Sequence, residues 1–381
     1  MDFSWTDEQL ALRRQIISFA EENLNDNLVD DDRAGRFSRS KWKACAEFGI
    51  QGLNVPVAYG GQGHDILTTV FALEALGYGC RENSLPFAIG SQLLSVQPAL
   101  LKVGSEEQKN QYLPALCSGE FIGAFGITEP ETGSDTYALQ TTATPRSGGY
   151  VLNGRKSYIT SAPVADVAVV FASTKPELGR WGISAFIVER GIAGFRASPV
   201  RDKMGMRTTP MGDLIFEECF VPESCRLGPE GVGVSLFATA MESERGYIFA
   251  TQIGRMERQL EESVRYAEER RAFDQPINEF QSVSNRLADM KLRLETARML
   301  LHKVAWLEQT GQPVMLTAAL AKLHISECLV ESSLDAIRIH GARGYVTEFE
   351  VERDLRDAVG GLIYSGTSDI QRNLIARLLS S

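Results

Sequence analysis

The chain has 381 residues, of which 44% are hydrophobic, 23% are charged and 8% are aromatic. A chain of this length buries a large core and is expected to divide into two or three domains. The 49 acidic residues against 39 basic ones give a formal net charge of −10. This balance argues against nucleic acid or an anionic membrane as the main partner.

Metal sites and targeting signals are not expected. The six cysteines include no Cys-x-x-Cys pair and the four histidines are scattered, so zinc, iron–sulfur and disulfide-rich sites are not predicted. No hydrophobic run reaches the ~20 residues of a membrane helix. The N-terminal Met-Asp-Phe-Ser-Trp-Thr-Asp-Glu is acidic, whereas a targeting signal would be basic. These features predict a cytoplasmic protein.

The first third of the chain, residues 1–120, is predicted to be an all-α domain. Thr6 and Gln9 have the spacing of a capping box at a helix start. The hydrophobic residues that follow, up to Leu24, recur every three or four positions, as on one face of a helix. Further helices are expected at 67–76 and 106–113.

Residues 121–228 are predicted to form a β-barrel-like middle domain. The strongest strand signal is 150–160, in which Asn153-Gly154 has the composition of a tight hairpin turn. Other expected strands lie at 167–171, 183–188 and 214–221, separated by proline and glycine.

Residues 229–381 are predicted to form a C-terminal helical bundle. Helical periodicity extends through 237–272, 283–309, 314–340 and 370–379, and Gly311-Gln312-Pro313 is a stop signal. The predicted fold is therefore an α+β multi-domain chain with an N-terminal helical domain, a middle β domain and a C-terminal four-helix bundle.

One carboxylate interrupts a hydrophobic helix face. Phe237, Met241, Glu244 and Ile248 are spaced by four, three and four residues, so Glu244 lies on a buried face. Such a charge needs an ion-pair partner or a chemical role, and spacing alone supports both equally. Glu242 points ~200° away on the same helix and is expected to be solvated.

Sequence blocks along nearly the whole chain resemble acyl-CoA dehydrogenases in their order. These blocks are 125–135, 154–160, 203–222, 270–273 with 280–281, 340–345, 356–357 and 363–372. The resemblance implies the acyl-CoA dehydrogenase fold and FAD as the cofactor. Within this family, segments 280–286, 290–295 and 364–367 look most like L-prolyl-carrier-protein dehydrogenases, which oxidise proline tethered to a peptidyl carrier protein.

The resemblance also identifies the base. Many family members use the glutamate of a Tyr-Glu-Gly-Thr motif, but that position is Ser365 in this chain. The branch that lacks this glutamate resembles 241–245, where the glutamate before arginine is the base; this residue is Glu244. Arg245 is expected to orient the site helix, and a backbone amide of the Ser365 loop is expected to polarise the thioester carbonyl.

The same resemblance assigns the flavin contacts. In the middle domain they are Phe125, Ile127, Thr128, Gly133, Ser134, Tyr158 and Thr160. Tyr158 replaces a common tryptophan and would form an aromatic wall. Contacts from an adjacent subunit would be Arg270, Phe273 and Gln281. Arg338 replaces a common glutamine near the flavin tail, and Thr367 and Asp369 would lie near the adenosine.

The leading functional prediction is FAD-dependent oxidation of a carrier-bound L-prolyl thioester in secondary-metabolite biosynthesis, with Glu244 taking the α-proton. Two alternatives remain open: a dehydrogenase for a short or branched acyl-CoA, and a non-catalytic flavin-binding module. The expected partners are a peptidyl or acyl carrier protein, further copies in a homotetramer, and either an electron-transfer flavoprotein or oxygen as acceptor. Lys203 and Arg207 could meet an acidic carrier protein or simply be solvated.

Overall fold

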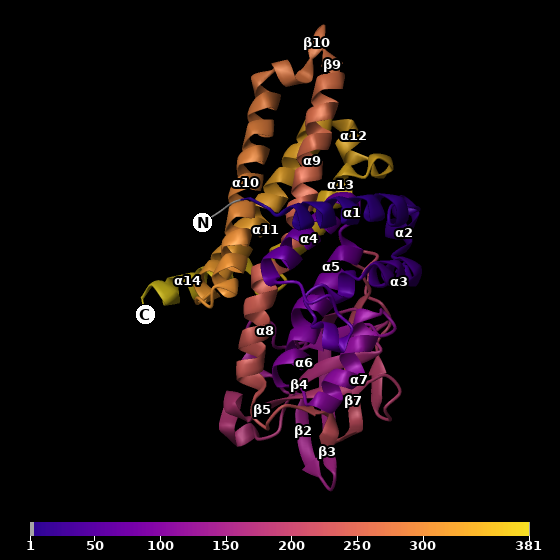
Figure 1. Ribbon diagram of the computed structural model, residues 1–381, viewed down its shortest axis with the longest axis vertical. Helices are drawn as coiled ribbons and strands as arrows, with labels where there is room; N and C mark the ends of the chain where they lie inside the picture. The colour runs from indigo at the N-terminus through magenta and orange to yellow at the C-terminus, as the bar shows by residue number, and fades with distance from the viewer. Residues whose placement is uncertain (1–3, 381) are drawn as a thin grey trace.

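The computed structural model describes residues 4–380, which form a helical block, a β block and a second helical block in chain order (Figure 1). This order confirms the predicted fold class. Within the described residues, no helix combines the length and hydrophobicity that a membrane crossing requires.

The N-terminal block begins at the predicted capping box. The Thr6 hydroxyl accepts a hydrogen bond from the Gln9 amide, and the Gln9 side chain accepts one from the Thr6 amide. A π-helix, η3 (Gln92–Val96), joins two α-helices without a break. The α-helices of this block are α1 (Asp7–Asn23), α2 (Leu28–Ala34), α3 (Arg39–Phe48), α4 (Ile66–Gly79), α5 (Ser84–Ser91), α6 (Gln97–Val103) and α7 (Glu106–Cys117).

The middle block is a sheet with the order β6-β7-β3-β2-β4-β5-β8, and β1 pairs in parallel with β4. Its strands are β1 (Gly123–Gly126), β2 (Thr142–Arg146), β3 (Gly149–Thr160), β4 (Val167–Ser173), β5 (Ile183–Glu189), β6 (Phe195–Ala197), β7 (Met211–Pro222) and β8 (Arg226–Leu227). Residues of β4 alternate between two cores. Val169 and Phe171 pack with helical residues such as Leu113, whereas Val170 packs within the β block.

The prediction of a hairpin turn at Asn153-Gly154 is wrong. Strand β3 continues through both residues, and its register against β7 shifts between Leu152 and Gly154, as at a β-bulge. A Cβ atom at Gly154 would lie 2.6 Å from Thr141 Oγ1, so glycine is required for close approach. The turn between β2 and β3 lies instead at residues 147–148, where Gly148 has φ of 80°.

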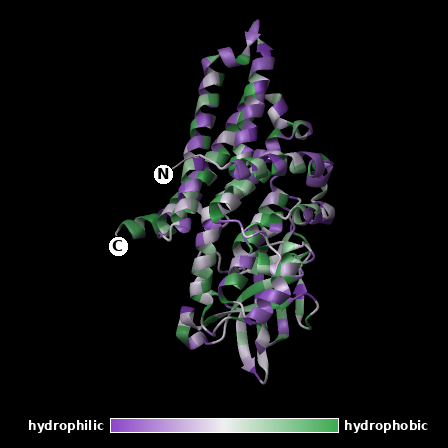
Figure 2. Ribbon diagram, in the orientation of Figure 1, coloured by the Kyte–Doolittle hydropathy of each residue, from purple (hydrophilic) through white to green (hydrophobic). Residues whose placement is uncertain are grey.

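The C-terminal block contains long helices that project away from the β block (Figure 1). The helical stretch predicted at 237–272 is two helices, because the helix is interrupted at residues 248–249. Figure 2 shows hydrophobic and hydrophilic residues mixed along the projecting pair, α9 and α10. The elements are α8 (Gly233–Tyr247), α9 (Ala250–Glu269), β9 (Arg271–Ala272), β10 (Gln275–Pro276), α10 (Gln281–Gln309), α11 (Met315–His340), α12 (Ala342–Tyr345), α13 (Val351–Gly361) and α14 (Ser368–Leu379).

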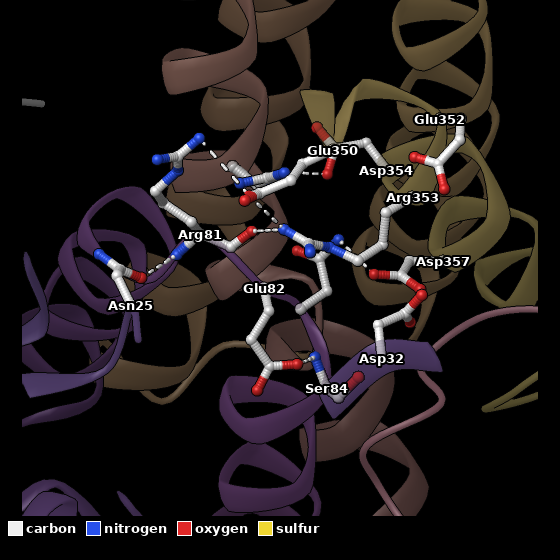
Figure 3. A network of polar contacts seen from close by, with 12 residues as sticks. Asn25, Asp32, Arg81, Glu82, Ser84, Glu350, Glu352, Arg353, Asp354 and Asp357 are labelled. Atoms are coloured by element: carbon white, nitrogen blue, oxygen red, sulfur yellow. Dashed lines mark hydrogen bonds and ion pairs between the residues drawn. The ribbon is translucent and has the colours of Figure 1, made fainter. Parts of the chain in front are cut away.

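Helix α13, which we did not predict, holds the three blocks together through a polar junction (Figure 3). Asp357 accepts hydrogen bonds from the Met206 amide at 2.5 Å and from Asn83 Nδ2 at 3.2 Å. Arg353 donates to the Arg81 carbonyl at 2.8 Å. The junction thus fixes α13, and the loop after it, against both other blocks.

Candidate active site

Glu244 lies where the helix periodicity predicts. It is in the last turns of α8, and its stripe neighbours Phe237, Met241 and Ile248 are at most 7% exposed. Phe237 also packs edge-on against Phe171 of the β block, with ring centroids 6.1 Å apart. These contacts fix α8 on the sheet and leave Glu244 half-buried beside the loop after α13.

Two hydroxyl groups bind the Glu244 carboxylate. Ser365 Oγ donates to Oε1 at 2.5 Å, and Ser95 Oγ donates to Oε2 at 2.6 Å. Within residues 4–380, Glu244 forms no ion pair with an arginine, lysine or histidine. The geometry therefore disfavours the structural ion pair that the spacing left open.

The loop that contains Ser365 is held through its carbonyl groups. Ser365 has φ of 56° and Gly366 has φ of 89°, so both occupy the left-handed region. The Ser365 carbonyl accepts from Arg245 Nε at 3.2 Å and from Gln371 Nε2 at 3.3 Å. Arg245 therefore contacts this loop, while no hydrogen bond from the Ser365 amide is found within residues 4–380.

Two cations near Glu244 and Ser365 are poorly solvated. Burial lowers the pKa of Arg245, although the nearby Glu244 opposes this shift. Burial also lowers the pKa of Lys322 to about 8, and its buried Nζ atom has no hydrogen-bond partner among residues 4–380. Glu242, which we predicted to be solvated, is half-buried, and burial raises the pKa of its carboxyl.

The flavin residues predicted in the β block lie on or next to β1 and β3. The Ser157 amide of β3 donates to the Thr128 carbonyl at 2.8 Å, which joins the end of β1 to the middle of β3. The following loop is pinned by Glu129, whose carboxylate lies 2.7 Å from the buried Lys156 Nζ and accepts from the Thr141 amide. The sequence analysis did not single out this buried pair.

These β-block residues fit a flat, polar-edged ring. Tyr158 is 54% exposed and has φ of 61°, whereas its neighbours Ser157 and Ile159 are buried. The hydroxyl oxygens of Ser157 and Thr132 are buried and have no hydrogen-bond partner in the part of the chain that the structure describes. The other predicted flavin residues of the β block differ in exposure. Thr128, Thr160 and Phe125 are half-buried, Ile127 is buried, and Gly133 and Ser134 are exposed. The exposed Tyr158 ring, which has the Arg201 guanidinium 5.0 Å from its centroid, and the unpaired hydroxyls of Ser157 and Thr132 match the chemistry of an isoalloxazine.

The residues predicted to come from an adjacent subunit lie at the other end of the molecule. Arg270, Phe273 and Gln281 surround the β9–β10 turn at the tip of the projecting hairpin, opposite the β block (Figure 1). All three are exposed, and Phe273 is 91% exposed. One chain therefore does not bring them together with Thr128 or Tyr158.

Arg338, Thr367 and Asp369 have other contacts within the chain. Arg338 pairs with the buried Asp335 at 3.1 Å, beside two further arginines. Thr367 caps α14 by accepting from the Ile370 amide, and Asp369 is exposed. Their predicted contacts with the flavin tail stay predictions.

Lys203 and Arg207 are not simply solvated. Lys203 Nζ donates to the Thr209 carbonyl at 2.7 Å, and Arg207 Nε donates to the Asp32 carbonyl at 2.9 Å. Both side chains are half-buried and hold the main chain. A role in carrier-protein docking stays a prediction.

Sequence reasoning missed Ser95, which touches the predicted base. It lies 149 residues before Glu244 and within a π-helix, so no local periodicity relates the two. Sequence reasoning also missed Lys322, because a single lysine in a long helix gives no signal that it is buried.

Comparisons with known proteins agree with this architecture. Family models match the acyl-CoA dehydrogenase N-terminal domain at residues 6–120, the middle domain at 124–219 and the C-terminal domain at 231–380. The chain is 44% identical over 380 residues to L-prolyl-[peptidyl-carrier protein] dehydrogenase of Pseudomonas fluorescens, with all of both chains covered.

Two solved structures are also similar. The prolyl acyl carrier protein oxidase AnaB has a TM-score of 0.98 at 46% identity, covering 99% of this chain and 100% of AnaB. PigA with FAD and proline has a TM-score of 0.97 at 38% identity, covering 100% of this chain and 99% of PigA. The full-length match of sequence, domain order and fold shows that the chain belongs to the acyl-CoA dehydrogenase family of FAD-dependent oxidoreductases.

Proposed function

We propose that this protein oxidises an L-prolyl thioester tethered to a peptidyl carrier protein, with Glu244 as the base that takes the α-proton and FAD as the hydride acceptor. The relatives named for prolyl carrier substrates support the substrate, and they match over the full length of the chain. A pyrroline-type product on a carrier protein suits a role in secondary-metabolite biosynthesis.

The observation that carries the proposal is the hydrogen bond from Ser365 to Glu244. Ser365 occupies the motif position at which many relatives supply the catalytic glutamate. Its hydroxyl donates to a carboxylate from α8 instead, so the two sequence positions lie next to each other in the fold. A carboxylate is thus retained where the chemistry needs it, although it comes from a different helix.

The residues of the chain have separate roles at this site. Glu244 removes the α-proton in a region where burial limits access of water. Arg245 and Gln371 hold the carbonyl of Ser365, and this leaves the Ser365 amide to donate to the developing enolate oxygen. Bound FAD supplies the hydride acceptor at this site.

FAD would be held by two copies of the chain. Thr128, Tyr158 and Thr160 would contact the ring from one subunit, whereas Arg270 and Phe273 would come from a neighbour. Two exposed hydrophobic residues of α10, Leu292 at 62% and Met299 at 58%, support burial of this helix between subunits. The proposed assembly is a homotetramer.

The substrate is tested by stopped-flow flavin reduction with prolyl-carrier protein, prolyl-CoA and butyryl-CoA. The expected result is fast bleaching with prolyl-carrier protein, slower bleaching with prolyl-CoA and none with butyryl-CoA. A loss of two mass units from the loaded carrier would identify the two-electron oxidation. Bleaching by butyryl-CoA alone would favour the acyl-CoA alternative, and no bleaching by any thioester would favour the non-catalytic one.

The shared site is tested by mixing two inactive variants, Glu244→Gln and Arg270→Ala. Hybrid assemblies would combine an intact base and an intact tip at some of their sites, so mixing after dissociation should restore part of the activity. Mixing without dissociation is the control. No recovery in verified hybrids would contradict a site shared between subunits.

A further inference from the structure

We infer that Ser95 and Ser365 are a pair of positioning residues that hold the Glu244 carboxylate through reversible hydrogen bonds. This inference rests on the proposed role of Glu244 as a base. It assigns a function to Ser95 and to the Ser365 side chain, which is separate from the role proposed for the Ser365 amide.

The geometry restrains both oxygens of the carboxylate. Ser365 Oγ lies 2.5 Å from Oε1, and Ser95 Oγ lies 2.6 Å from Oε2. The three residues come from separate elements: the loop after α13, the π-helix η3 and helix α8. Because each carboxylate oxygen has its own donor, the pair fixes the side-chain torsions of Glu244 before substrate binds.

The residue type of the donors suits a proton acceptor. A hydroxyl donates to a carboxylate and can also accept from a carboxylic acid by rotating its O–H bond. Arginine and lysine have no acceptor atom and favour only the charged carboxylate. Arg245 is the neighbouring cation, but its Nε atom is directed to the Ser365 carbonyl. The serine pair therefore orients Glu244 in both of its protonation states.

The local backbone explains why these two serines can converge. Ser95 is 0% exposed within η3, where the Gln97 amide donates to the Gln92 carbonyl five residues earlier. Such π-helical turns often occur at functional sites. Ser365 is in the left-handed region with φ of 56°. Both conformations are departures from regular helix that direct a hydroxyl toward the same carboxylate.

The test uses Ser95→Ala and Ser365→Gly in the FAD-loaded full-length protein. Alanine is favourable in a helix, and glycine tolerates the positive φ at position 365. Each variant should reduce the limiting rate of flavin reduction by roughly 10-fold, as expected for loss of a hydrogen bond to a charged group. The affinity for the prolyl-carrier protein should be unchanged. Ser243→Ala, on α8 next to Glu244, is the matched control.

The pH dependence distinguishes positioning from a general structural effect. The hydrogen bond that a serine hydroxyl donates to the charged carboxylate is stronger than the one it makes with the neutral acid, so its loss should move the midpoint of the pH–rate profile up. Exchange of the substrate α-proton with D2O in the reduced enzyme should slow in parallel, as a readout that does not require flavin turnover. Ser95→Cys, a weaker donor of similar size, should give an intermediate result.

Wild-type rates and an unchanged pH midpoint in both serine variants would overturn the inference. So would an equal effect of Ser243→Ala. Failure of the proposed function is distinguishable, because the wild-type protein itself would then not bleach with prolyl-carrier protein. The serine variants would still be measured with whichever thioester bleaches the flavin.

Discussion

The candidate site at Glu244 and the junction at α13 hold their carboxylates in different ways. Glu244 is bound by two neutral hydroxyls, whereas Asp354 at the junction is paired with the buried Arg255 and also accepts from Gln259. A buried ion pair fixes the charge of both partners, and a hydroxyl pair does not. The buried ion pair of Arg255 with Asp354 therefore stabilises the fold, whereas the neutral donors of Glu244 do not fix the charge of this carboxylate.

The largest expected effect is the loss of activity in Glu244→Gln. Removal of a general base should lower flavin reduction by roughly 10²- to 10⁴-fold, while bound FAD and the melting temperature should change little. Stopped-flow absorbance and the flavin spectrum measure both quantities. Glu242→Gln, two positions earlier on α8, is the control and should reduce flavin at near the wild-type rate. Normal reduction in Glu244→Gln would remove this residue from the mechanism.

At the junction, Asp354→Ala is expected to change the stability of the fold, whereas Glu244→Gln changes the activity. Leaving Arg255 buried without its partner should lower the free energy of unfolding by about 3–5 kcal/mol, as measured by urea titration. The double variant Arg255→Met/Asp354→Leu should recover most of this loss, because it removes both charges. A single variant as stable as the wild type would show that the pair contributes nothing to the architecture.

Asp357 sharpens the comparison because it is a buried carboxylate that forms no direct ion pair with any residue of the described range 4–380. Burial raises its pKa from 3.8 to about 7, so the folded state retains a proton that the unfolded state loses between about pH 4 and 7. Its contribution to stability is complete below about pH 4 and is lost as pH rises through about 7. Asp357→Asn should abolish this pH-dependent loss in the free energy of unfolding, which amounts to about 2–4 kcal/mol. Identical pH–stability curves would contradict the assignment.

The smallest expected effect is a gain of stability in Lys322→Met. Burial lowers the pKa of this lysine to about 8, so wild-type stability should rise between about pH 8 and 10.5, where only the unfolded state retains the proton. Methionine removes the buried charge and should add about 1–2 kcal/mol at pH 7. Thermal melts at pH 7 and pH 10 measure the change. A loss of stability instead would show that Nζ has an important partner.

Local pattern was sufficient for much of the fold. The capping box at Thr6 and Gln9 was confirmed, and the helical stripe put Glu244 on the buried face of α8. Each of these features depends on residues a few positions apart. The Asn153-Gly154 prediction failed because the same dipeptide suits a tight turn and a bulge, and only the close approach of Thr141 decides between them.

The rest depends on distant segments. Ser95 meets Glu244 only after the N-terminal block packs on α8, and Asp357 meets the Met206 amide across 151 residues. No periodicity in the sequence encodes these contacts. The resemblance to the family supplied the pairing of Ser365 with Glu244, which residue spacing alone could not.

A small rotation at the base of the projecting hairpin, the pair α9 and α10, produces a larger displacement at its tip. Its first helix, α9, has 20 residues and is therefore about 30 Å long. The ion pair of Arg255 with Asp354 lies near its base. A tilt of ~3° there would displace the tip by about 1.5 Å, enough to break a hydrogen bond. Packing defects at the base of α9 would thus be amplified into misplacement of Arg270 and Phe273, far from the defect itself.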